Sequence, residues 1–179
     1  MRTSLRITLT LVLAISGVSV AWADGRFHVP GTAYAAHFSG VPECETGKVE
    51  TPAGAIERHV CAYYDERLGG GYAIEYVSLP SIPRTSEAQL ILKSAAAGAA
   101  QESQSEITHE SSVRIEGHPA LDVVFLKRKE GSLARVRYVL VGRDLVTLSI
   151  DGGSRLHESP EAAAFLDSLR LGSPGSASP

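Results

Sequence analysis

The sequence predicts an α+β domain with a mainly antiparallel sheet of about seven or eight strands and two main helices. Apolar and polar side chains alternate in a series of short segments, which is the period of half-buried strands. Two segments change to the helical period of three to four residues. The order is four strands, a helix, four strands and a helix, which is typical of helices packed on an antiparallel sheet.

Four strands are predicted in the first half of the chain, at 34–38, 47–51, 56–64 and 72–79. The turn residues 52–54 make the second and third of these strands the arms of a hairpin. Three consecutive glycines, 69–71, separate the third strand from the fourth, and Pro80 ends the fourth.

The first helix is predicted over residues 86–101. Ser86, with Gln89 three residues later, has the form of a capping box, and the segment is rich in Ala, Leu, Lys and Gln. We expect a narrow apolar face to lie on the sheet, because an apolar residue recurs every four positions at Ile91, Ala95 and Ala99.

The second half repeats this plan, with strands predicted at 106–116, 120–128, 134–140 and 145–151. Ser159 is the expected cap of the last helix, with Pro160 in its first position and Glu161 behind it. Gly172 is expected to stop this helix. Its core-facing stripe has helical spacing and consists of Ala162, Phe165, Leu166 and Leu169.

Residues 1–23 have the three parts of a cleavable signal peptide. Arg2 and Arg6 supply the positive charge, residues 7–20 are predominantly apolar, and 21–23 have the small-x-small form that signal peptidase accepts. The apolar run is shorter than the roughly 20 residues that a transmembrane helix needs. We therefore expect cleavage and export to the periplasm or the extracellular space, with an uncleaved membrane anchor as the alternative.

The mature chain is expected to begin at Asp24, to fold as one domain over 24–172, and to end in a disordered tail over 173–179. Of the 17 basic residues, two lie in the signal peptide, so 15 face 20 acidic ones and the mature net charge is near −5. This balance argues against a nucleic-acid partner, which would require a basic face.

The two cysteines, Cys44 and Cys61, are expected to form a disulfide. With a two-residue turn at 52–53, paired positions across the hairpin add up to 105, so Cys61 lies opposite Cys44. If the turn is shifted by one residue, the residue opposite Cys61 is at position 46 instead. An oxidising compartment favours the bond, and the alternative is a soft-metal site made by Cys44, His59 and Cys61.

Two candidate binding surfaces are predicted. One is basic and contains Arg135, Arg137 and Arg143, with the neighbouring cations at 127–129. It would suit an acidic partner or an anionic envelope component, although salt bridges on a solvated sheet face would also explain it. The other is rich in tyrosine, which is favoured at interfaces but also faces inward in many sheets; it contains Tyr72 and Tyr76, with Tyr63 and Tyr64.

Four segments carry a resemblance to a known fold. They are 31–42, 72–76 followed by Pro80, 115–119, and 137–145 leading to 164–168. In order and spacing they resemble small bacterial exported proteins with a PsbP/Mog1-like fold, although Ser39 stands where that family usually has Pro. The resemblance covers most of 31–171 and implies an α/β/α sandwich. It also implies a binding, assembly or accessory role without a catalytic residue.

These observations predict a non-enzymatic exported accessory or binding domain of the bacterial cell envelope. The expected partner is an envelope protein or an anionic component, and no cofactor is expected. No Gly-x-Ser-x-Gly turn occurs, and the glycine run 69–71 lacks the Lys-Ser/Thr ending of a phosphate loop. The alternative is a small exported metal-handling protein or enzyme, which a deep pocket with His37 or His59 at its base would favour.

Overall fold

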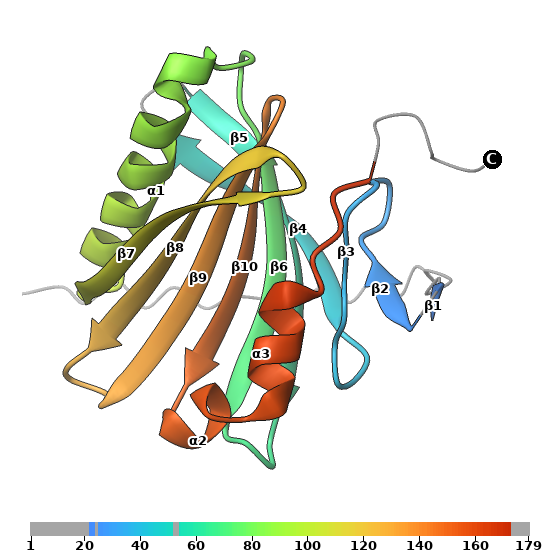
Figure 1. Cartoon of the computed structure of the whole chain (residues 1–179), viewed down its shortest axis with the longest axis vertical. Helices are drawn as coiled ribbons and strands as arrows, with labels where there is room; N and C mark the ends of the chain where they lie inside the picture. Colours follow the sequence, from blue (N-terminus) through green and yellow to red (C-terminus); the bar gives the residue numbers. More distant parts are fainter. Residues whose placement is uncertain (1–21, 24, 52–53, 173–179) are drawn as a thin grey trace, which may run out of the picture.

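A computed structural model describes residues 22–23, 25–51 and 54–172. Within them, seven strands form an antiparallel sheet in the order β4-β5-β6-β10-β9-β8-β7, with helices on both faces (Figure 1). The α+β prediction and its three layers are confirmed. The strands are β4 (Glu43–Thr51), β5 (Gly54–Asp65), β6 (Gly70–Ser78), β7 (Glu106–Ile115), β8 (His118–Lys127), β9 (Ser132–Val141) and β10 (Asp144–Gly152).

The segment before the main sheet differs from its prediction. Instead of a strand over 34–38, it forms a small separate sheet with β1 (Trp22–Ala23), β2 (Arg26–His28) and β3 (Ala35–Ala36). We call residues 25–42 the N-terminal arm. Its consecutive residues Ala35 and Ala36 are both buried, because β3 also pairs with the end of the chain through Ala35 and Arg170.

The predicted signal peptide and tail lie outside the described residues, apart from the two residues of β1. The predicted hairpin is confirmed, because Thr51 pairs with Gly54 and Cys44 with Cys61. Strand β4 begins four residues earlier than predicted. Its first half is exposed and polar, so it carries no apolar alternation that could have marked it.

Helix α1 (Ala88–Glu102) follows a single 3₁₀ turn, η1 (Thr85–Glu87). The predicted cap at Ser86 is wrong, because the Arg84 amide donates to the Glu87 carboxylate at 2.9 Å and starts the turn two residues earlier. The apolar face is also displaced: the predicted residues Ile91, Ala95 and Ala99 are half-buried flanks. The fully buried centre, which faces Leu121, Val123 and Phe125 of β8, consists of Ala88, Leu92 and Ala96.

On the other face lie α2 (Ser154–His157) and α3 (Pro160–Asp167). The Ser159 cap is confirmed, since its hydroxyl accepts the Ala162 amide hydrogen at 3.2 Å. The predicted stripe is buried, but the helix ends at Asp167 rather than at Gly172. The chain then becomes extended to pair with β3, and this carries Leu169 into the core.

Candidate functional site

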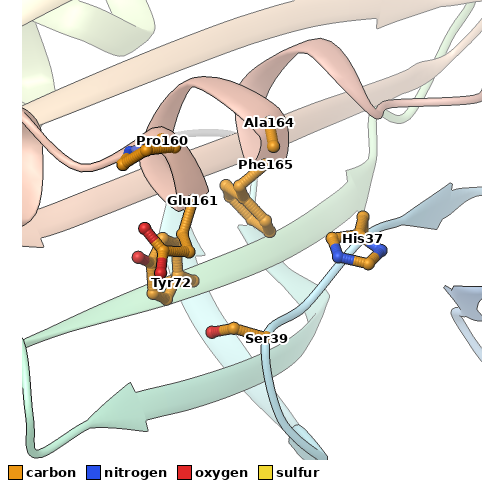
Figure 2. Close-up of a pocket in the computed structure, with 7 residues that line it drawn as sticks. All are labelled: His37, Ser39, Tyr72, Pro160, Glu161, Ala164 and Phe165. Carbon is orange, nitrogen blue, oxygen red and sulfur yellow. The ribbon is translucent and has the colours of Figure 1, made fainter.

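A pocket of about 190 Å³ lies between the first turns of α3, strand β6 and the N-terminal arm (Figure 2). We call it the α3 pocket. Figure 2 shows His37 on one side, Tyr72 and Glu161 on the other, and Phe165 between them. The pocket is lined by His37, Ser39, Tyr72, Pro160, Glu161, Ala164 and Phe165.

The α3 cap sets the upper wall of this pocket. Pro160 occupies the first helical position, so Glu161 and Ala164 lie in the first turns of the helix. They are three residues apart and therefore on the same side of it. Phe165 points into the core with 1% exposure and meets Tyr72 edge-on, with 5.2 Å between ring centroids. The pocket therefore has a rigid aromatic wall, fixed by packing rather than by a loop.

Tyr72 is the most deeply buried polar residue at the site, with 2% of its surface exposed. Its ring stacks on Tyr63 at 6.4 Å. Its hydroxyl is buried and lies near the Ser159 side chain, but it makes no hydrogen bond of normal geometry within the described residues. Burial raises the pKa of Tyr72, the Ser159 side chain acts to lower it, and the charges of Asp65 and Glu161 act to raise it. The phenol is therefore neutral and keeps a free donor and acceptor.

Glu161 carries the negative charge at the pocket. A hydrogen bond from its own backbone amide lowers the pKa of Glu161, and Arg67 lowers it further. The Arg67 guanidinium donates to this carboxylate at 2.9 Å and lies 3.6 Å from Asp65. Glu161 is therefore an ionised acceptor held by a cation from the hairpin between β5 and β6.

His37 forms the opposite wall, from the N-terminal arm. Its Nδ1 lies 2.8 Å from the backbone oxygen of Gly25. A carbonyl oxygen can only accept, so Nδ1 carries the proton, and a ring with this single proton has Nε2 as an acceptor. The backbone amide of His37 donates to Ser168 at 2.7 Å, which fixes the arm against the end of α3.

A second hollow of about 590 Å³, the hairpin groove, adjoins the α3 pocket, and Ser39 and Glu161 line both. Gly40 allows the arm to lie directly on the Tyr63 ring, because a Cβ there would be 2.3 Å from that ring. Tyr64 is 63% exposed. The groove is lined by Ser39, Tyr63, Tyr64, Asp65, Glu66, Arg67 and Glu161.

A third hollow, of about 520 Å³, lies at the other end of β6 and contains His59, Tyr76 and Arg143. The His59 and Tyr76 rings stack with 4.4 Å between centroids. The two nitrogens of His59 lie 2.7 Å from Glu57 and 3.1 Å from the Thr46 hydroxyl. His59 is thus held by its neighbours on the sheet.

The predicted Cys44–Cys61 disulfide is confirmed. Both sulfurs of the alternative Cys44–His59–Cys61 site are bonded to each other, so neither is available as a thiolate ligand. Within the described part of the chain, no group of three or more His, Cys, Asp or Glu residues could hold a metal ion. Among the same residues, no helix is long and apolar enough to cross a membrane.

The structure does not gather the predicted basic residues into one patch. Arg137 is mostly buried and donates two hydrogen bonds to Asp122, at 2.8 and 2.9 Å, and one to the Leu166 oxygen at 2.6 Å. Arg135 is half-buried two residues away, and Arg143 is exposed in the turn between β9 and β10. Lys127 pairs with Asp151, and Arg128 with Glu106.

The predicted tyrosines are separated as well, since Tyr72 lines the α3 pocket and Tyr76 the third hollow. Sequence reasoning missed Arg67 and Glu161, which lie 94 residues apart and meet only in the fold. The sequence marks Glu161 only as a carboxylate at the start of a helix, and it marks Arg67 only by its place before the glycines 69–71.

No protein-family model and no curated protein matches the chain. Among solved structures, the chain is similar to the solution structure of PsbP (CyanoP) from the cyanobacterium Synechocystis sp. PCC 6803. The TM-score is 0.55 at 9% sequence identity, and the match covers 89% of this chain and 97% of that one. The fold is therefore PsbP-like, as the sequence motifs predicted.

Proposed function

We propose that this chain is a non-enzymatic accessory or binding domain exported to the bacterial cell envelope, and that it binds its partner at the α3 pocket and the hairpin groove. One observation carries the proposal. The buried Tyr72 hydroxyl has no hydrogen-bond partner within the described residues, and its ring lines the α3 pocket. Buried polar groups are normally satisfied, so this hydroxyl is available to a bound group.

Export is supported by two features of the molecule. The Cys44–Cys61 disulfide is typical of proteins that fold in an oxidising compartment. The PsbP-like fold supports the same assignment through the resemblance to small exported proteins. Both agree with the signal peptide that the first 23 residues predict.

Binding is supported by the size and connection of the two hollows. The α3 pocket, at about 190 Å³, is smaller than the roughly 300–1,000 Å³ of sites that enclose a whole small molecule. It has room for one side chain. The hairpin groove beside it is larger and open, and its exposed Tyr64 is of a residue type that often carries binding energy. This combination suits a partner that anchors one group and lies along the surface.

The test is capture from the host's own envelope fraction with a mature protein that begins at Asp24. We expect a defined species to be retained by the unmodified protein and lost with Tyr64→Ala. The matched control is Leu90→Ala, because Leu90 is 68% exposed on α1, on the opposite face of the sheet. Equal capture by all three proteins would contradict the proposed site. Free thiols in protein isolated from its host would contradict export.

A further inference from the structure

We infer that the group entering the α3 pocket is a cationic side chain, Lys or Arg, presented by a segment of a protein partner. The inference rests on the proposed function and specifies the chemistry of its ligand. It is carried by the hydrogen-bonding character of the pocket, by the charge around it and by its size.

The polar atoms of the pocket are mainly acceptors. Glu161 offers an ionised carboxylate, the His37 ring with its proton on Nδ1 offers Nε2, and the Tyr72 hydroxyl makes no hydrogen bond of normal geometry within the described residues. A lysine ammonium or an arginine guanidinium only donates hydrogen bonds, so it complements this set. Bonds from such cations to a carboxylate are also stronger than neutral ones.

The aromatic wall favours the same ligand. Tyr72 and Phe165 meet edge-on at 5.2 Å and both line the pocket. A cation close to an aromatic face is attracted by the ring quadrupole, and more strongly where water is excluded. The methylene stem of Lys or Arg can meanwhile contact Pro160 and Ala164.

An anion is disfavoured, although the pocket lies at the start of a helix. Pro160 has no amide hydrogen, the Ala162 amide donates to Ser159, and the Glu161 amide donates to its own carboxylate. The first donors of α3 are therefore already used. An anionic ligand would in addition face the Glu161 charge.

The hairpin groove, like the α3 pocket, is acidic. Its lining contains three carboxylates, from Asp65, Glu66 and Glu161, against the single guanidinium of Arg67. Arg67 already donates to Glu161 at 2.9 Å, so the carboxylate accepts a cation within the fold itself. An incoming cation has to share Glu161 with Arg67, which makes Arg67 a competitor of the ligand.

The partner is a protein segment because the two hollows adjoin each other at Ser39 and Glu161. A free amine would fill only the pocket of about 190 Å³ and leave the groove of about 590 Å³ unused. A segment can insert one side chain and lay its neighbours along Tyr63 and Tyr64. Because the groove is acidic, charge complementarity favours a segment with a net positive charge.

The experiment is a titration of the mature protein followed by two-dimensional amide NMR. The probes are capped five-residue peptides, Gly-Ala-X-Ala-Gly, in which X is Lys, Arg, norleucine or Glu, and n-butylamine as a free amine. We expect the Lys and Arg peptides to shift the amides of Ser39, Tyr72, Glu161 and Ala164 saturably. The norleucine and Glu peptides should bind at least about fivefold more weakly, because they lack the charge-assisted bonds.

Three variants test whether binding of the Lys peptide depends on the charge at the pocket. Glu161→Gln should weaken binding of the Lys peptide about fivefold, and Arg67→Gln should strengthen it about threefold by removing the competitor. The matched control is Glu130→Gln, which makes the same charge change as Glu161→Gln on the turn between β8 and β9 and should have no effect. Circular dichroism establishes that each variant is folded.

The inference is overturned if the norleucine or Glu peptide binds as well as the Lys peptide, or if Glu161→Gln and Glu130→Gln behave alike. Shifts confined to another surface would overturn it too. Binding of n-butylamine as tight as that of the Lys peptide would overturn the assignment to a protein partner. If envelope capture depends on Tyr64 while no cationic peptide binds, only this inference fails. If capture is also independent of Tyr64, the proposed function fails with it.

Discussion

Asp144 joins the N-terminal arm to the sheet at the level of single side chains. Its two carboxylate oxygens accept hydrogen bonds from the Tyr34 and Ser78 hydroxyls, each at 2.6 Å. Tyr34 is buried, with 6% exposure, and its ring meets Tyr76 edge-on at 5.7 Å. Burial raises the pKa of Tyr34, and the hydrogen bond to Asp144 raises it further. Asp144 of β10 thus links the N-terminal arm to β6 through two hydroxyl groups.

Replacing Asp144 should therefore destabilise the fold. Asp144→Ala removes the acceptor of both hydroxyls and should lower the free energy of unfolding by about 1–3 kcal/mol, whereas Tyr34→Phe should cost about 0.5–1.5 kcal/mol. Urea unfolding of the two variants and their combination measures the coupling. If the two losses simply add up, the hydrogen bond does not supply the coupling described here.

The buried tyrosines predict a limit on stability at high pH. Burial is the largest cause that raises the pKa of each of four phenols above the ordinary value: Tyr34, Tyr72, Tyr76 and Tyr138. Since the folded pKa exceeds the unfolded value of about 10, their contribution is complete below that pH and is lost as the pH rises above it. As the pH is raised, we expect the tyrosinate absorbance to increase over the same pH range in which the circular dichroism signal of the fold is lost. Ionisation of these phenols with a native spectrum would contradict the burial.

Residue patterns indicated the chemistry of the candidate site only in part. Alternation placed Tyr72 and Arg137 on definite faces of their strands, but it could not show that α3 covers the face that they share. Cover by α3 makes Tyr72 a pocket wall and turns Arg137 toward Asp122 and Leu166. Likewise, no local pattern could pair Arg67 with Glu161, because that contact depends on the whole fold.

At the scale of elements, the hairpin of β4 and β5 is a sequence prediction that extends to the pairing of individual residues. A two-residue turn placed at 52–53 fixes the register, so the position opposite Cys61 could be calculated without tertiary information. The face of α1 could not be fixed in this way. Apolar residues recur every four positions in two neighbouring series, one at 88, 92 and 96 and one at 91, 95 and 99. The position of β8 decides which series lies at the centre.

The disulfide should stabilise this hairpin and the domain. Cys44 and Cys61 are 17 residues apart, and closing a loop of this length is worth about 3 kcal/mol in the chain-entropy model. Replacing both cysteines by Ser should lower the melting temperature while the fold persists at low temperature. Cys61 is buried, so the double Ala variant separates the lost cross-link from the cost of a buried hydroxyl. Equal melting temperatures for the oxidised wild type and the double Ala variant would contradict the prediction.

The sequence did not delimit the short elements. The alternation over 34–38 predicts a strand of which only the two residues of β3 form, and the four residues of α2 are too few to show a helical period. Their conformation follows from contacts made elsewhere. Strand β3 pairs with Arg170 near the end of the described chain, and Leu156 of α2 is buried in the core on the same face.

For the molecule as a whole, the two ends of the described chain close one face of the sheet. The N-terminal arm and the segment after α3 pair through Ala35 and Arg170, and both lie over the face opposite α1 (Figure 1). Phe27 and Phe38 of the arm belong to the same hydrophobic cluster as Ile74, Leu148 and Phe165. The arm is therefore part of the core, and the α3 pocket exists because the arm passes beside the helix.

Phe38 provides the test of this closure, because it is 3% exposed and its ring contacts Phe27 at 5.7 Å and Phe165 at 5.0 Å. Phe38→Ala should lower the free energy of unfolding by about 3–5 kcal/mol, as expected for an emptied aromatic site in a core. Val41→Ala is the matched control in the same arm, since Val41 is 62% exposed. If arm and sheet form one cooperative unit, urea unfolding of Phe38→Ala remains a single transition with an unchanged slope and an earlier midpoint. A separate early transition, with the sheet unfolding at its original midpoint, would mean that the arm is an independent flap and that the α3 pocket opens without loss of the fold.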